Sequence, residues 1–201
     1  IVASRKAALD IIEEANYGDR PNGDGPRIQE GDFVRAQITS VARDSIAVVV
    51  GGVDTRVSLH ALTFEYLVDA RTKYKVGQEI MVQVEQIIKE KDGHHIVEVN
   101  CKQPELERAK QMRSALPIGS IVFGIVSSVA ASKKQPGNIN VLAYIKMYDL
   151  PVLVNNMPAK FLGSEPPRGS TVRLKVLNYL DNGMILCRCI GTQGPMNFPN
   201  A

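Results

Sequence analysis

The 201-residue sequence lacks the features that a membrane span or a secretory signal requires. No apolar run approaches the ~18 residues that mark a membrane-spanning helix. The sequence begins Ile1-Val2-Ala3-Ser4, with neither an initiator methionine nor the apolar core of a signal peptide. We interpret this start as a truncated or processed end, and we expect a cytoplasmic protein that does not enter a membrane.

Cysteine is scarce, because the sequence has only Cys101, Cys187 and Cys189. An odd, low number argues against a framework of disulfides and favours a reducing compartment. Cys187 and Cys189 would share one side of a strand, but no second ligand pair accompanies them, and a structural zinc site needs four ligands. His94 and His95 are adjacent, so on a strand they would point to opposite faces. We therefore expect three free thiols, no bound metal and no cofactor.

Catalytic patterns are also missing. The sequence shows no paired carboxylates, no nucleophile beside a partner base and no phosphate-binding loop. The glycine-rich stretch 18–25 has no strand before it and no lysine that opens a helix, both of which a phosphate loop needs. We expect that the protein is not an enzyme. A hydrolase fragment with its catalytic domain upstream of Ile1 stays open as an alternative.

Charge is unevenly distributed along the chain. The net charge is −2 over residues 1–26 and −1 over residues 27–103. Residues 104–201 carry 11 basic and 5 acidic side chains, a net charge of +6. Positive potential in the second half would attract a polyanion there first.

One pattern of glycine and apolar residues occurs twice. Residues 31–41 read GDFVRAQITSV and residues 119–129 read GSIVFGIVSSV. Other landmarks recur at a similar offset: strands after Gly77 and Gly169, hairpin turns at Asp92-Gly93 and Asn182-Gly183, and closing strands at 96–102 and 185–190. An insertion at 133–138 accounts for the drift in the offset. The repetition predicts two domains of one kind.

The first copy divides into predicted strands at 33–42, 45–50, 53–59, 79–90 and 95–102, with a short helix within 60–76. Five strands with a helical crossing between the third and fourth are the plan of the OB fold, a small barrel that commonly binds oligonucleotides. In the second copy, residues 139–148 alternate, which predicts odd positions in the core and even positions on an open face.

Helices are predicted at 4–16 and 103–116 from apolar residues at three- and four-residue spacing. The predicted fold is all-β with short helices: two five-stranded OB-type Greek-key barrels joined by a helix, plus an N-terminal helix. The expected parts are an N-terminal helix and flexible linker at 1–26, a first barrel at 27–103, a connecting helix at 104–117, and a second barrel with a loose tail at 118–201.

These motifs resemble the ribosomal S1-type RNA-binding domain. The resemblance rests on Gly31…Val34-x-Ala36-x-Ile38, Val57-x-Leu59-x-x-Leu62, Val76-Gly77…Ile80-x-Val82-x-Val84 and Val97-x-Val99-Asn100-Cys101-Lys102. It covers the first copy and, more weakly, the second, and it implies an OB-type barrel that binds RNA.

The first copy departs from the family at the positions that usually stack on bases. The family's Gly-x-Phe-Val step reads Ser45-Ile46-Ala47-Val48, without a ring. The family often has a histidine where this chain has Ser58, and His60 follows two residues later, where we expect it on the same face of the strand. The first barrel therefore lacks the usual stacking platform, which favours a protein-binding role for it.

The candidate RNA-binding residues come from both copies. Aromatic rings next to basic side chains bind single strands with little sequence preference. In the second copy these residues are Phe123, Lys133, Lys134, Tyr144, Lys146 and Tyr148, and in the first copy they are Phe33, Arg35, Arg56 and His60. The alternative is that Phe123 is core and that the tyrosines pack under the connecting helix or the other barrel.

We expect a non-catalytic protein that binds single-stranded RNA with low sequence specificity, in translation or RNA handling. The alternative is a module that binds protein within a ribosome, polymerase or virion assembly. The expected partners of this protein are single-stranded RNA and a larger ribonucleoprotein or protein assembly.

Overall fold

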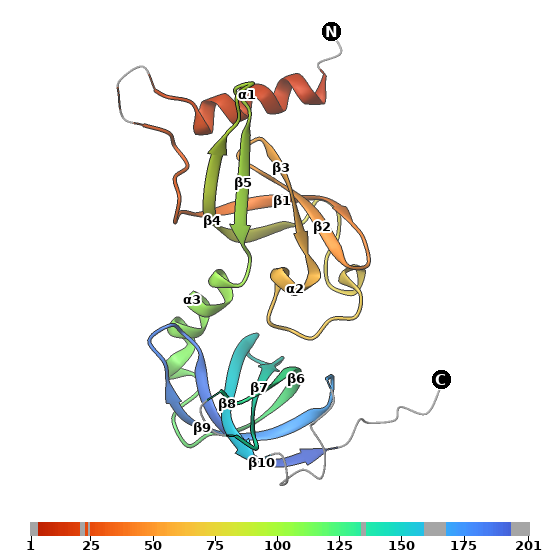
Figure 1. Cartoon of the computed structure of the whole chain (residues 1–201), viewed down its shortest axis with the longest axis vertical. Helices are drawn as coiled ribbons and strands as arrows, with labels where there is room; N and C mark the ends of the chain where they lie inside the picture. The colour runs from red at the N-terminus through yellow and green to blue at the C-terminus, as the bar shows by residue number, and fades with distance from the viewer. Residues whose placement is uncertain (1–3, 21–22, 24, 134–135, 159–167, 194–201) are drawn as a thin grey trace. The chain divides into compact units, whose positions relative to one another are not determined.

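The computed structural model has the predicted fold class: two five-stranded, barrel-like sheets with a few short helices and an N-terminal helix (Figure 1). The structure describes all residues except 1–3, 21–22, 24, 134–135, 159–167 and 194–201. Within this part of the chain, no helix is long and apolar enough to cross a membrane.

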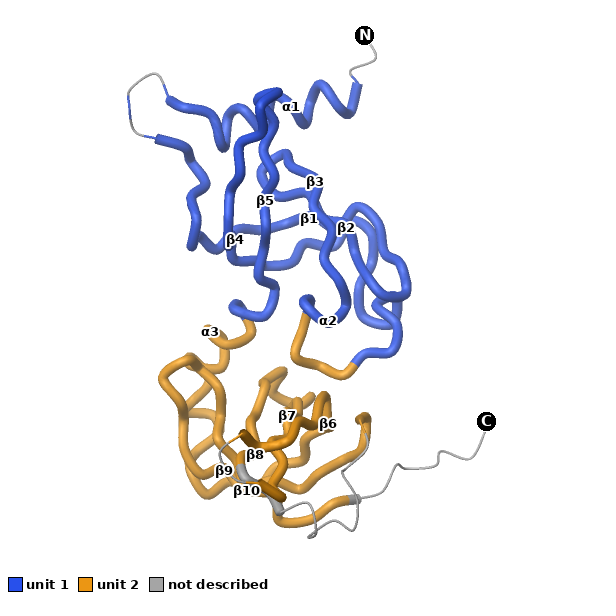
Figure 2. The backbone as a smooth tube through the Cα atoms, in the orientation of Figure 1, with its two compact units in different colours: residues 1–62, 67–104 blue, residues 63–66, 105–201 orange. Residues whose placement is uncertain are grey.

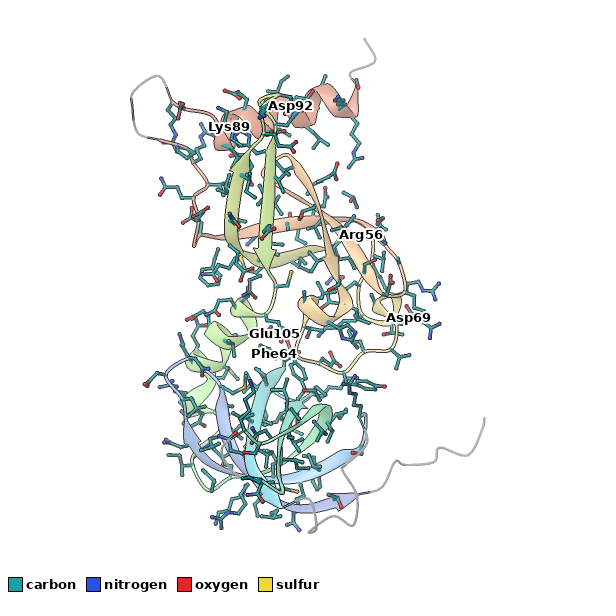
Figure 3. All side chains as sticks on the ribbon, viewed as in Figure 1. Arg56, Phe64, Asp69, Lys89, Asp92 and Glu105 are labelled. Carbon is teal, nitrogen blue, oxygen red and sulfur yellow. The ribbon has the colours of Figure 1, made fainter. Side chains whose placement is uncertain are left out.

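The chain divides into two compact units (Figure 2). Unit 1 comprises residues 1–62 and 67–104, and unit 2 comprises residues 63–66 and 105–201. The short segment 63–66 belongs to unit 2 because it bonds to Glu105. The Thr63 hydroxyl donates to Glu105 Oε1, and the Phe64 backbone N–H donates to Glu105 Oε2 at 3.0 Å (Figure 3).

Unit 1 contains a sheet of five strands in the order β3-β2-β1-β4-β5. The strands are β1 (Phe33–Val41), β2 (Ser45–Val50), β3 (Val53–Ser58), β4 (Glu79–Lys89) and β5 (His95–Asn100). Every predicted strand of this copy is confirmed to within two residues. The connection from β3 to β4 contains α2 (Leu59–Leu62) and the 3-10 turn η1 (Ala70–Thr72).

Alternation of side chains sends one face of each strand into the core of unit 1. The buried residues include Ala36, Ile38, Ile46, Val48, Val57, Val82, Val84 and Val97. Most are β-branched, and such side chains pack well on a pleated surface. The opposite face of β1, β2 and β3 is left for solvent or a ligand.

Helix α1 (Arg5–Tyr17) packs against the β2–β3 turn and the β4–β5 hairpin of unit 1. The Tyr17 hydroxyl donates to the Val50 carbonyl at 2.9 Å, and the Asn16 amide donates to the Gly51 carbonyl at 3.1 Å. Glu13 accepts the His95 backbone N–H at 2.6 Å. Burial would raise the pKa of Glu13, but its hydrogen bonds with His95 and His94 outweigh this effect and lower it.

Unit 2 is a closed barrel in the order β10-β8-β7-β6-β9. The strands are β6 (Ile121–Ala131), β7 (Asn138–Ile145), β8 (Leu150–Pro158), β9 (Thr171–Tyr179) and β10 (Ile185–Gln193). All ladders are antiparallel except that of β8 with β10. Sequence analysis identified no strand at β8, because it follows β7 through a tight turn without a glycine or proline.

Helix α3 (Gln103–Gln111) and the turn η2 (Met112–Ser114) account for the predicted connecting helix. The apolar edge predicted for it is confirmed, because Ala109 and Leu116 are buried in the core of unit 2 and Met112 packs against that core. Gly183 lies so close to α3 that a Cβ there would meet the Leu106 carbonyl oxygen at 2.4 Å.

The predicted alternation of 139–148 holds only as far as Ile145, where β7 ends. Met147, expected in the core, is 84% exposed, because residues 146–149 form the turn into β8. Asp149 completes that turn with a φ of 57°. The prediction that Tyr144 lies on an open face is also wrong, since this side chain is 1% exposed.

Gly52 offers a test of how closely α1 approaches the barrel. It has a φ of +104°, and a Cβ there would meet the Glu13 backbone nitrogen at 2.4 Å. We expect Gly52→Ala to lower the free energy of unfolding by about 1–2 kcal/mol for the left-handed backbone, and by about 1–3 kcal/mol more for overpacking.

Gly93→Ala is the matched control, because Gly93 has a φ of +93° and no heavy atom lies within 4 Å of the position that a Cβ would take there. It should show the backbone cost alone in urea unfolding followed by circular dichroism. Equal shifts of the midpoint for the two variants would contradict close packing of α1 on this turn.

The cysteines are unbridged, and their surroundings differ. Cys187 is buried in unit 2, which raises the pKa of its thiol to about 12, whereas Cys189 is half-buried. Since the thiolate is the reactive form, we expect iodoacetamide to label Cys189 faster than Cys187 in the native protein. Unfolding without a reductant should give three labels by mass spectrometry, and fewer would show a disulfide.

Candidate nucleic-acid interface

The residues predicted to bind RNA in unit 1 lie mostly on the outer face of its sheet. Phe33 is 45% exposed on β1, and Arg35 is exposed on the same strand. Arg56 is exposed on β3 and lies opposite Ala47 of β2. His60 is exposed but lies on α2, because β3 ends at Ser58. The expectation that His60 continues the face of β3 is therefore wrong.

Neighbouring polar groups engage the cations of this face. Arg35 forms an ion pair with Glu79 at 3.5 Å. The Arg56 guanidinium donates two hydrogen bonds to Ser45 Oγ, at 2.9 and 3.1 Å. Ala47, between these groups, replaces the ring that the resemblance would place there. The face therefore offers Phe33 for stacking, together with Arg35 paired to Glu79 and Arg56 held by a neutral hydroxyl.

The residues predicted to bind RNA in unit 2 differ in location and burial. Phe123 is 54% exposed on β6, so the alternative that it belongs to the core is wrong. Tyr148 is half-buried and packs against the core. Lys146 lies in the β7–β8 turn, with Nζ 3.9 Å from Glu65 Oε1. Lys133 is exposed after β6. Lys134 lies outside the described residues.

Tyr144 is buried because α3 and the β7–β8 turn pack over it. Its hydroxyl donates to Asp149 Oδ1 at 2.6 Å, and Asp149 also pairs with Arg108 of α3 at 2.8 Å. Burial, reinforced by the charge of Glu105 and the bond to Asp149, raises the pKa of Tyr144. This confirms, for Tyr144, the alternative in which a tyrosine packs under the connecting helix.

The structure does not bring the predicted residues of unit 2 into one site. Lys133 lies at the β6–β7 end of the barrel, and Lys146 lies at the β7–β8 end. The eight-residue strand β7 separates them, which corresponds to about 25 Å. Lys133 and Lys146 therefore do not meet at one place on the barrel.

Instead, the strand register brings Phe123 together with cations that sequence analysis did not single out. Phe123 lies opposite Arg173, and Ile121 lies opposite Lys175. Lys175 lies opposite Arg188 of β10. Directly opposed residues share one face of a sheet. We call Phe123, Arg173, Lys175 and Arg188 the β9 patch. All four are exposed.

The β9 patch has no acidic neighbour in its registered pairs, and none of its cations forms a salt bridge with any residue that the structure describes. The described acids of unit 2 lie elsewhere, in the segment 63–66, on α3 and in the β7–β8 and β9–β10 turns: Glu65, Glu105, Glu107, Asp149 and Asp181. The positive charge predicted for the second half is therefore uncompensated at this patch.

The sequence contains the alternation that places these cations on the outer face of the barrel. Val172, Leu174 and Val176 alternate into the core, so Arg173 and Lys175 must point outward. Cys187 is buried, which leaves Arg188 on the outer face. The alternation gave the direction of each side chain, but only the register of three strands shows that these cations meet Phe123.

Residues 27–95 match the family model of the S1 RNA binding domain. This match confirms the resemblance predicted for the first barrel. It ends at residue 95, so it does not extend to the second barrel. A search of curated proteins found no match.

Two solved structures show similarity to this chain. One is an a/eIF2alpha-aDim2p-rRNA complex from Pyrococcus horikoshii OT3, with 16% identity and a TM-score of 0.33 over 42% of this chain and 56% of that chain. The other is a multidomain protein with nucleic acid binding domains from Streptococcus pneumoniae TIGR4, with 14% identity and a TM-score of 0.30 over 80% of this chain and 51% of that chain. The chain thus spans about half the length of each.

The burial of Tyr144 leads to a prediction about stability. Tyr144→Phe removes the hydrogen bond to the Asp149 carboxylate, which we expect to cost about 1–3 kcal/mol of unfolding free energy. Tyr144→Ala should cost about 3–5 kcal/mol by leaving a cavity. Chemical denaturation measures both changes. If Tyr144→Ala retains stability and loses only RNA affinity, the ring is exposed and this account is wrong.

Proposed function

We propose that this protein binds single-stranded RNA with low sequence specificity, and that the β9 patch of unit 2 supplies much of the affinity. The observation that carries the proposal is the exposed ring of Phe123, registered against Arg173 and beside Lys175 and Arg188, none of which has an ion-pair partner among the described residues. The family match of residues 27–95 supports RNA as the ligand. A role in translation or RNA handling, within a larger ribonucleoprotein, is part of the proposal.

The chemistry of the patch suits a single strand. The ring of Phe123 can stack on any base, and stacking contributes about 1–3 kcal/mol per base. Arg173, Lys175 and Arg188 can neutralise phosphates without distinguishing bases. A duplex hides the faces of its bases, so it would gain the charge contacts without the stacking. Low sequence specificity follows, because neither kind of contact reads the edge of a base.

The experiment is fluorescence anisotropy with a labelled single-stranded RNA, using the whole chain over a range of salt concentrations. For single strands, each phosphate contact adds about 0.7 to the slope of log K against log salt. Replacing Arg173, Lys175 and Arg188 together by glutamine should weaken binding to every sequence and flatten the slope by about 2. The control is Lys110→Gln, because Lys110 is already paired with Glu107 at 2.6 Å.

A second variant separates stacking from charge. Phe123→Ala should weaken binding by about 5- to 100-fold at all salt concentrations and leave the slope nearly unchanged, since stacking releases no counterions. Val76→Ala is the control, because Val76 is an apolar side chain that is 66% exposed and lies in unit 1, whereas the β9 patch lies in unit 2. Double-stranded DNA should compete poorly.

The alternative function gives a different result. Ala47 leaves unit 1 without a ring at the centre of its outer face, which favours a protein-binding role for that barrel. If the whole chain fails to bind RNA at low salt, the proposal is wrong and a module of a protein assembly is the better account. If RNA binds but the patch variants retain full affinity, unit 1 or Lys133 supplies the contacts.

A further inference from the structure

We propose that Asp10, Glu13 and His94 form a binding site for a divalent zinc ion that links α1 to the β4–β5 hairpin of unit 1. One ligand atom from each of these residues lies within 4.8 Å of the other two. The inference is independent of RNA binding, since the site lies in unit 1 and uses none of the residues of the β9 patch.

The expectation that His94 and His95 point to opposite faces of one strand is wrong, because only His95 lies on a strand. His94 precedes β5 and lies in the hairpin turn, where strand alternation does not apply. As a result, both imidazole rings face the Glu13 carboxylate. His95 Nδ1 is 2.9 Å from Glu13 Oε1, and His94 Nδ1 is 3.4 Å from Glu13 Oε2.

The two oxygens of Glu13 have different roles. Oε1 accepts the His95 backbone N–H at 2.6 Å and also contacts the His95 ring, so it is held inside unit 1. The His95 ring itself packs on Tyr17, with centroids 5.5 Å apart. Oε2 is turned toward the exposed His94. Metal-binding carboxylates are commonly oriented in this way by hydrogen bonds behind them.

Asp10 supplies the third protein ligand. Asp10 precedes Glu13 by three residues on α1, so the two carboxylates lie on the same face of the helix. Zinc bonds to nitrogen and oxygen ligands at about 2.0–2.2 Å, which sets tetrahedral ligand atoms about 3.3 Å apart. The 3.4 Å between His94 Nδ1 and Glu13 Oε2 is close to this value.

The ligand set favours zinc over other common ions. Imidazole nitrogen with carboxylate oxygen suits Zn²⁺, whereas Ca²⁺ and Mg²⁺ prefer oxygen alone. Asp10 and His94 are accessible to solvent, so the ion can enter from outside and water can fill the fourth position. The hairpin tip marked by Asp92 and Lys89 lies at α1 in Figure 3. A bound ion would therefore join two segments that are 81 residues apart.

The test is isothermal titration calorimetry of the whole chain with zinc chloride, together with thermal unfolding. We expect one ion per chain and a rise in melting temperature with zinc, because an ion that binds only the folded state stabilises it. His94→Ala and Asp10→Asn should each weaken zinc binding at least ~10-fold, since each removes one of three protein ligands. His60→Ala is the control, since His60 is an exposed histidine on α2, and it should bind zinc as the parent does.

Cobalt substitution distinguishes this site from the cysteines. Co²⁺ bound by nitrogen and oxygen gives visible d–d bands without the intense thiolate charge-transfer band in the near ultraviolet. A thiolate band, or zinc affinity unaffected by both His94→Ala and Asp10→Asn, would overturn the proposal, as would the absence of binding at millimolar zinc. If these two variants have the parent's melting temperature without metal, their loss of zinc affinity is not caused by misfolding.

Discussion

Strand pairing determines which side chains of each unit are buried and which are exposed. Every strand must send alternate side chains into a core while its backbone pairs in a fixed register. In unit 2 this constraint closes five strands into a barrel, with β8 and β10 pairing in parallel. The same register that buries Val172 and Leu174 places Arg173 against Phe123 on the outside. Because a slip of one residue would invert both faces, the core and the β9 patch are specified together.

Helices and turns decide which parts of the outer faces stay open. In unit 2, α3 and the β7–β8 turn close over Tyr144 through Asp149 and Arg108. In unit 1, α1 lies against the β2–β3 turn, where only a glycine at position 52 leaves room for the helix backbone. These helices and turns therefore reduce the area of each outer face that a ligand can reach.

The two units differ in how their surface charge is compensated. The outer face of unit 1 pairs Arg35 with Glu79 and engages Arg56 with Ser45. The β9 patch of unit 2 has no such partners among the residues described. Residues 27–103, which include the part that matches an RNA-binding family, carry a net charge of −1, whereas residues 104–201 carry +6. Positive potential is therefore concentrated in unit 2, while the ring of Phe33 is exposed on unit 1.

Local patterns in the sequence were enough to establish the fold class, the strands of unit 1 and the exposure of Arg35 and Arg56, because alternation, glycine turns and hairpin dipeptides act over a few residues. The concentration of positive charge after residue 103 was equally plain from the sequence. Tertiary contacts, by contrast, bury Tyr144, place Lys133 and Lys146 at opposite ends of β7, and bring His94 to Glu13. These outcomes depend on contacts between segments far apart in the chain or on where a strand turns, and side-chain periodicity along one segment carries no information about either.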